Sequence, residues 1–107
     1  MNMRLERIGT TLVVKLDGEL DHHSASEVRE KIDREINLRK INNLILDFDK
    51  VDFMDSSGIG VIAGRYKIID SLGGKIMIIR ANEQVDKILE ISGLKKILEV
   101  NKAGGEI

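Results

Sequence analysis

Short apolar runs alternate with helix-patterned segments along this chain, and no other feature constrains the fold as strongly. The runs Asn43–Phe48 and Ile76–Ile79 are typical of strands, and four consecutive apolar residues in the second predict cover on both faces. Between the runs, apolar residues recur every three or four positions, as on one face of a helix. An alternation of strands and helices predicts parallel pairing with right-handed crossovers, and therefore an α/β fold.

The N-terminal part departs from this alternation. Two short apolar runs, Met3–Ile8 and Thr11–Leu16, meet at a Gly-Thr pair and predict a β-hairpin, and Gly18 is expected to end the second run. The predicted sheet is therefore small and mixed, with four or five strands: a hairpin first, then parallel strands with helices packed on them. We expect one domain over residues 1–107, with a frayed tail at 100–107.

Three helices are predicted, over about residues 24 to 37–39, 57 to 72 and 82 to 92. Ser24 and Glu27 have the spacing of a capping box, and Asn82 can cap the third helix. Gly73 and Gly74 are expected to stop the second helix. The segment 94–100 predicts a turn followed by a short edge strand.

Two polar segments, GELDHHS from Gly18 and DKVDFMDSSG from Asp49, follow predicted strands. The carboxyl ends of parallel strands lie at one edge of a sheet, where ligands and partners usually bind. The two segments should therefore be neighbours in space, although they are far apart in the sequence. This edge is the candidate functional site.

Composition excludes several function classes. The 17 basic and 18 acidic residues nearly cancel, which argues against nucleic acid or an anionic membrane as the partner. The absence of cysteine excludes thiol catalysis, thiolate metal sites and disulfides. No apolar run approaches the roughly 20 residues that span a bilayer, and the start has no signal-peptide core. These features fit a cytoplasmic protein.

One interpretation of the chain as an enzyme depends on Gly58, Gly60 and Ala63, which match the dinucleotide pattern G-x-G-x-x-A. In a true fingerprint the first glycine directly follows a strand. Here about nine residues, 49–57, are expected to intervene, so close helix packing is the better explanation of these glycines.

A second interpretation as an enzyme depends on His22 and His23, which could bind a metal ion or act as a general base. The pair lacks a third metal ligand at a convincing spacing. Asp21, one of these histidines and Ser56 could meet at the shared edge as in a serine hydrolase, but no G-x-S-x-G elbow is present. The main interpretation is therefore a regulator that is not an enzyme. A small serine- or nucleotide-dependent enzyme that uses the same loops is the alternative.

Asp55, Ser56 and Ser57 stand where the second helix is expected to begin. Aspartate and serine are favoured N-caps, so capping alone can explain the three residues. Asp55 or Ser57 can also cap while the other hydroxyl stands free and accepts a phosphate. These residue types leave the choice between Ser56 and Ser57 open.

Three segments resemble the anti-sigma factor antagonists of the STAS domain family: GELDHH at 18–23, FMDSSGIGVIAGRYK at 53–67 and SGLKKI at 92–97. The resemblance covers about residues 3–100 and is closest to the antagonists that release the sporulation sigma factor F; a general-stress antagonist is the alternative. In this family the first serine after the aspartate accepts the phosphate, which implies Ser56. Members usually carry a further C-terminal helix, whereas this sequence ends soon after Val100.

The resemblance implies a partner switch. The unmodified protein binds an anti-sigma factor that is a serine kinase, and a PP2C-type serine phosphatase reverses phosphorylation of Ser56. ATP, ADP and magnesium would belong to these partners, so no cofactor or metal is expected in this chain. Ile59 can face the partner or its own core, and both remain open. The expected partner-binding residues are Asp21, His22, His23, Asp55, Ser56, Ser57, Gly58, Ile59 and Gly60.

Overall fold

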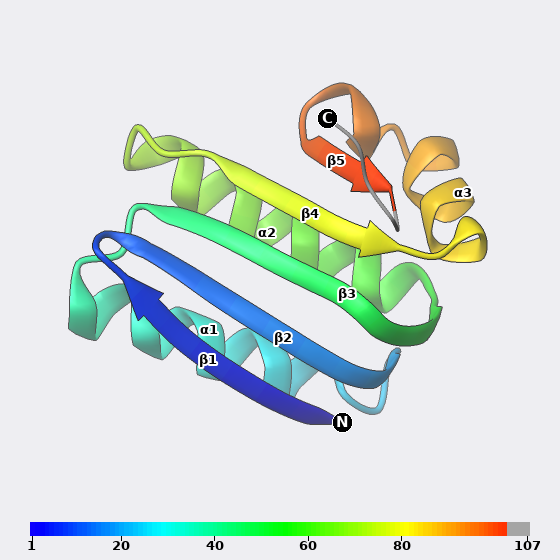
Figure 1. The fold of residues 1–107 in the computed structure, drawn as a ribbon, viewed down its shortest axis with the longest axis horizontal. Coiled ribbons are helices and arrows are strands. Elements are labelled where there is room, and N and C mark those ends of the chain that lie inside the picture. The colour runs from blue at the N-terminus through cyan, green and yellow to red at the C-terminus, as the bar shows by residue number, and fades with distance from the viewer. Residues whose placement is uncertain (103–107) are drawn as a thin grey trace.

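The computed structural model describes residues 1–102, and their side chains as far as Leu98. These residues form one sheet of five strands in the order β1-β2-β3-β4-β5. Helices α1 and α2 pack side by side on one face of the sheet, and α3 lies near the end of β4 (Figure 1). The elements are β1 (Asn2–Ile8), β2 (Thr11–Leu20), α1 (Ala25–Arg39), β3 (Asn43–Met54), α2 (Ser56–Ser71), β4 (Ile76–Ala81), α3 (Glu83–Ile91), the 3₁₀ turn η1 (Leu94–Lys96) and β5 (Glu99–Lys102).

The pairing confirms the predicted mixed α/β sheet. Strand β1 runs antiparallel to β2 around the turn at Gly9 and Thr10, and each later pair is parallel. Helix α1 connects β2 to β3, and α2 connects β3 to β4, as the alternation predicted. The helical periodicity is confirmed too, because Val28, Ile32 and Ile36 of α1 are buried.

Strands β2 and β3 are longer than predicted. Gly18 does not end β2; it lies within the strand at φ 125°, where the register shifts between Gly18 and Glu19. A bulge bends a strand and adds a residue without ending the pairing. The ladder therefore continues to the pair Leu20–Met54, and the strand predicted to end at Phe48 runs six residues further.

The prediction that β4 is covered on both faces is wrong. Ile76 and Ile78 are buried, whereas Met77 and Ile79 on the alternate face are only half-buried. An uninterrupted apolar run shows that both faces exclude some water, but it does not show that a helix covers each of them. The face opposite α1 and α2 is turned toward the viewer in Figure 1.

The C-terminal turn and edge strand are confirmed as η1 and β5. Residues 100–102 were predicted to fray, but they belong to β5, which pairs with β4 from Met77–Glu99 to Ala81–Lys102. Backbone hydrogen bonds can order such a segment even where its residues offer little to bury. The rest of the predicted tail, 103–107, lies outside the described residues.

The ends of α2 and α3 follow the predicted signals. The Asn82 carboxamide accepts a hydrogen bond from the N–H of Val85 at 2.8 Å, which confirms the cap of α3. Gly73 has φ 77°, and the N–H of Gly74 donates to the carbonyl of Ile69 at 3.0 Å, as at a helix C-terminus. Among residues 1–102, no helix is both long enough and apolar enough to cross a membrane.

Candidate functional site at the carboxyl edge of β2 and β3

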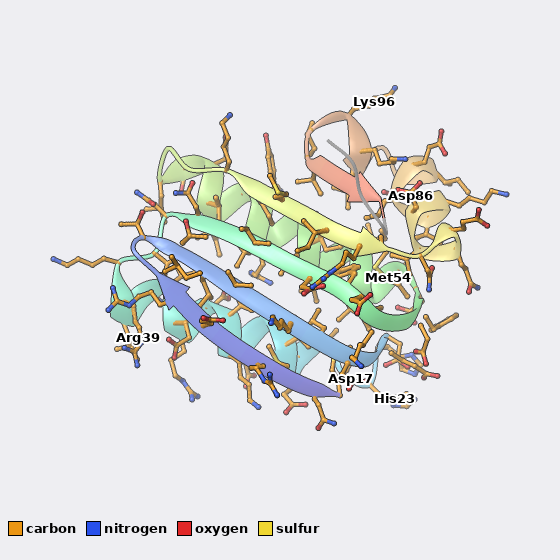
Figure 2. All side chains as sticks on the ribbon, viewed as in Figure 1. Asp17, His23, Arg39, Met54, Asp86 and Lys96 are labelled. Atoms are coloured by element: carbon orange, nitrogen blue, oxygen red, sulfur yellow. The ribbon has the colours of Figure 1, made fainter. Side chains whose placement is uncertain are left out.

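The two polar loops meet, as predicted. The final residues of β2 and β3, Leu20 and Met54, are paired, and the N–H of Asp55 donates to the Leu20 carbonyl at 3.4 Å. The His22 ring also approaches this loop, with Nδ1 3.6 Å from Oδ2 of Asp55. Figure 2 labels Met54 and His23 at this end of the molecule, far from Arg39 at the other end of α1. We call this region the carboxyl edge.

Asp55 is the N-cap of α2. Its Oδ1 accepts hydrogen bonds from the N–H groups of Ser57 at 2.8 Å and Gly58 at 3.4 Å, and its backbone is extended. A cap of this kind stabilises a protein by about 1 kcal/mol. Partial burial raises the pKa of Asp55, but the two N–H groups and the His22 ring outweigh it and hold the pKa below its ordinary value. The carboxylate is therefore ionised at neutral pH.

Ser56 is the first residue of α2, and it is exposed. Within the described part of the chain, its hydroxyl takes part in no hydrogen bond of the structure. Ser57 is half-buried behind it. The expectation that one residue caps while a hydroxyl stands free is confirmed, because Asp55 caps and Ser56 faces solvent.

Asp21 organises the other loop from inside. It is only 8% exposed, and its Oδ1 accepts from the N–H groups of His23 at 2.9 Å and Ser24 at 3.2 Å. Burial raises the pKa of Asp21, but these two hydrogen bonds prevail and lower it. The carboxylate is thus held inward, and it shapes the loop that carries the two histidines.

The predicted capping box at Ser24 is wrong. Ser24 itself has a helical backbone, and its hydroxyl does not cap α1. The hydroxyl donates instead to the carbonyl of Glu19 at 2.7 Å and accepts from the N–H of Asp21 at 3.1 Å. Sequence spacing missed this because Asp21, three residues earlier, already receives the N–H groups of the turn.

His22 and His23 are both exposed, and their ring centroids lie 4.0 Å apart. Within residues 1–102, no group of three or more histidine, aspartate or glutamate side chains is placed to hold a metal ion. The serine-hydrolase arrangement is also not assembled, because the Asp21 carboxylate bonds backbone N–H groups rather than a histidine ring.

The two glycines of the G-x-G pattern have different surroundings. A Cβ on Gly58 would lie 2.6 Å from the carbonyl oxygen of Leu20 and 2.5 Å from Cγ of Met54, so α2 can pack against β2 only with glycine there. A Cβ on Gly60 would meet nothing within 4 Å. Ile59, between them, is half-buried against the core.

The spacing argument against a nucleotide site needs correction. Because β3 extends to Met54, three residues rather than nine separate the strand from Gly58. The fingerprint still fails, for a different reason. Its glycines should form the turn that cradles a pyrophosphate, whereas Gly58 and Gly60 lie inside α2.

Sequence reasoning missed two residues, one in the interior of α2 and one at the carboxyl edge. Arg65 of α2 is only 5% exposed, and its Nε forms an ion pair with Oδ1 of Asp33 on α1 at 2.8 Å. The available signal was its spacing, since Arg65 lies four residues from both Val61 and Ile69 on the buried side of α2. Phe53, by contrast, is exposed at the carboxyl edge, and the strand prediction that ended at Phe48 left it in a loop.

The fold and the edge define a small α/β domain that presents a free serine hydroxyl at a capped helix start. The family described as the STAS domain matches residues 2–106, and the chain belongs to that family.

Particular relatives are similar over most of the chain. The anti-sigma F factor antagonist of Paenibacillus polymyxa is 40% identical over 100 residues, which are 94% of this chain and 86% of the relative. The anti-sigma-B factor antagonist of Bacillus subtilis is 28% identical over 102 residues, 94% of this chain and 91% of the relative.

The anti-sigma factor antagonist SpoIIAA matches in two forms, of which the phosphorylated one is from Bacillus. Its unphosphorylated form has a TM-score of 0.77 and 28% identity, covering 95% of this chain and 89% of SpoIIAA. Its phosphorylated form has a TM-score of 0.75 and 30% identity, covering 94% of this chain and 92% of SpoIIAA. The two forms therefore resemble this fold to nearly the same extent.

Proposed function

We propose that this chain is an anti-sigma factor antagonist that binds an anti-sigma factor and thereby frees sigma factor F. The observation that carries the proposal is the exposed Ser56 hydroxyl at the capped start of α2. The name of the relative that is 40% identical supports sigma F as the target. The general-stress alternative has weaker support, because the anti-sigma-B factor antagonist is 28% identical.

The switch is a reversible esterification. An anti-sigma factor that is also a serine kinase transfers the terminal phosphoryl group of ATP to Oγ of Ser56; the hydroxyl loses its proton, and ADP remains with the kinase. A PP2C-type phosphatase then uses water to release inorganic phosphate and restore the serine. Nucleotide and magnesium are bound by these partners in the cytoplasm, and this chain is a substrate and ligand rather than an enzyme.

Phosphorylation acts on docking rather than on the fold. A phosphoserine carries about −1.5 to −2 charge at neutral pH. At the start of α2 this charge meets the positive end of the helix dipole, which favours it, and the Asp55 carboxylate, which opposes it. Because these two local effects partly cancel, the net change in the stability of α2 is small, and the scaffold stays folded. The added charge and bulk instead lie on a surface that the partner must desolvate.

The residues of the carboxyl edge have separate tasks in this proposal. His22, His23, Ser56 and Gly60 are exposed and contact the partner directly. Asp21 holds the histidine loop in shape through its inward carboxylate. Asp55 and Ser57 belong to the cap, and Gly58 and Ile59 pack α2 against the domain.

The proposal is tested with the anti-sigma F factor of the same organism, ATP and magnesium. Intact mass should show one phosphate on the wild type and on Ser57→Ala, and none on Ser56→Ala. Ser56→Ala should still bind the anti-sigma factor, whereas Ser56→Asp should bind at least about tenfold more weakly, equivalent to about 1.4 kcal/mol. Phosphate on Ser57, or wild-type affinity for Ser56→Asp, would contradict the proposal.

A further inference from the structure

Exposed large apolar side chains are distributed unevenly over the described residues. The exposed ones are Ile8, Leu38, Phe53, Leu72, Ile91 and Ile97. Ile8 ends β1 beside the hairpin, Leu38 and Leu72 lie at the C-terminal ends of α1 and α2, Ile91 ends α3, and Ile97 precedes β5. Within residues 1–98, Phe53 is therefore the exposed large apolar side chain that lies at the carboxyl edge.

The strand geometry explains why the ring is exposed. Beyond the register shift at Gly18 and Glu19, the neighbouring side chains of Phe53 and Met54 point to opposite faces of β3, and Met54 is buried at 1% exposure. Phe53 therefore points to the face away from α1 and α2, where it is 38% exposed. It pairs across the ladder with Glu19 and follows Asp52, and both of these charged residues are exposed. An apolar ring with charged neighbours is the usual composition of an interface core with its rim.

Phe53 is also close enough to Ser56 to share one partner. Three extended residues span at most about 10 Å, so the Cα atoms of Phe53 and Ser56 lie within about that distance. A protein interface of standard size buries about 800 Å² on each side, which is wide enough to include both residues. A kinase that reaches Oγ of Ser56 must cover the surface between β3 and α2.

The core does not account for the exposed part of this aromatic ring. The chain has two phenylalanines and one tyrosine; Phe48 is fully buried, and Tyr66 is half-buried against the core. Aromatic residues are enriched among the few side chains that dominate binding energy at interfaces. Phe53 is the most exposed of these three aromatic residues, and it lies three positions before Ser56 in the sequence.

We infer that Phe53 is the apolar anchor by which the carboxyl edge binds the anti-sigma kinase, an inference that rests on the proposed function. In the complex the ring is desolvated against an apolar patch of the kinase, and Ser56 is thereby presented to the nucleotide. Phosphoserine 56 then places charge beside the surface from which water must be removed when Phe53 binds. Phosphorylation of Ser56 therefore weakens the same contact that the Phe53 ring makes.

The test compares Phe53→Ala and Phe53→Leu with Leu72→Ala, a matched loss of exposed apolar surface at the opposite end of α2. Affinity for the anti-sigma F factor of the same organism is measured by calorimetry, and phosphorylation kinetics give KM and kcat. We expect Phe53→Ala to weaken binding and raise KM by about tenfold or more, with kcat within about twofold, because Ser56 is untouched. Phe53→Leu should retain most of the affinity, and Leu72→Ala should match the wild type.

Thermal unfolding checks that each variant is folded. If Phe53→Ala does not fold, Phe53→Thr serves in its place, because a β-branched residue suits a strand. A wild-type KM and affinity in the folded variant would overturn the anchor while leaving the proposed function intact. If the wild type itself is neither bound nor phosphorylated by the kinase, the proposed function fails and the anchor fails with it.

Discussion

At the scale of single residues, Gly58 and Gly60 show how the domain can separate stability from binding. Glycine inside a helix is less favourable than alanine by about 1 kcal/mol. At Gly58 this cost is offset, because the close approach of α2 to the Leu20 carbonyl depends on the missing side chain. At Gly60 no contact within the domain offsets this cost. A close contact with a binding partner is therefore the better explanation of this glycine.

Substituting each glycine by alanine should therefore have opposite effects on stability. Gly58→Ala should lower the free energy of unfolding by about 1–3 kcal/mol, because the new methyl group meets rigid backbone. Gly60→Ala should raise it by up to about 1 kcal/mol, because its Cβ enters open space. Urea denaturation measures both, and calorimetry with the anti-sigma factor should show the more stable Gly60→Ala as the weaker binder. Equal stability of Gly58→Ala and the wild type would show that α2 can move away from β2.

At the scale of elements, the helices were easier to predict than the ends of the strands. Apolar spacing and end signals located α1, α2 and α3 to within one or two residues, because both are local properties of the chain. The extensions of β2 and β3 depend on bulges at Lys15 to Asp17 and at Gly18 to Glu19, which keep two strands in register across charged residues. Such pairing depends on a partner strand that is distant in sequence, so periodicity alone does not reveal it.

The site was predictable to a similar degree. Adjacency of the two loops followed from parallel topology. A cap at the start of α2 followed from residue type, but the choice of Asp55 over Ser57 needed the structure. The inward orientation of Asp21 could not be predicted. Asp21 and Ser24 are both polar, and only the packed loop determines which of them accepts the N–H groups of the turn. Exposure of Ser56 rather than Ser57 also needed the packed structure, since both hydroxyls have the same chemistry.

Phosphorylation of Ser56 should leave α2 folded, since the helix dipole favours the phosphate and Asp55 continues to hold the N–H groups of Ser57 and Gly58. Amide hydrogen exchange of the purified phosphorylated protein should show protection within about threefold of the unmodified protein along Val61–Ser71, because scaffold stability governs opening there. Ser56→Ala provides the unmodified control. Loss of protection throughout α2 would mean that the switch works by melting the helix.

At the scale of the whole molecule, ion pairs tie separate elements together, and in two of them one partner is a buried charged residue. Arg65 and Asp33 join α2 to α1 behind the sheet. Arg80 of β4 pairs with Asp47 of β3, and Nε of Arg80 lies 3.2 Å from Oδ1 of Asp47. Arg80 has φ 60°, a left-handed backbone that costs a residue other than glycine about 1–3 kcal/mol. The contact with Asp47, which is 3% exposed, helps to offset that strain.

The Asp47–Arg80 pair predicts how stability responds to acid. Burial raises the pKa of Asp47, but hydrogen bonds from Arg80 and from the N–H of Asp49 outweigh it, so the pKa in the folded protein is lowered. The pair's contribution is therefore fully present above the unfolded pKa of about 3.9 and is lost as pH falls through the lower folded value.

Asp47→Asn should accordingly lower the free energy of unfolding at pH 7 by about 1–3 kcal/mol, the usual worth of hydrogen bonds to a charged group. The difference from the wild type should begin to shrink as pH falls below about 4, because the unfolded wild-type chain then takes up a proton at Asp47 that the folded protein does not yet bind. The difference should be smallest once the pH is below the lowered folded pKa, where the folded carboxylate is protonated too. Urea denaturation from pH 7 down to the acid limit of the fold measures both quantities. Asp52→Asn removes the same charge from an exposed position and controls for net charge. A difference between Asp47→Asn and the wild type that stays constant with pH would show that the pair contributes through packing and not through its charge.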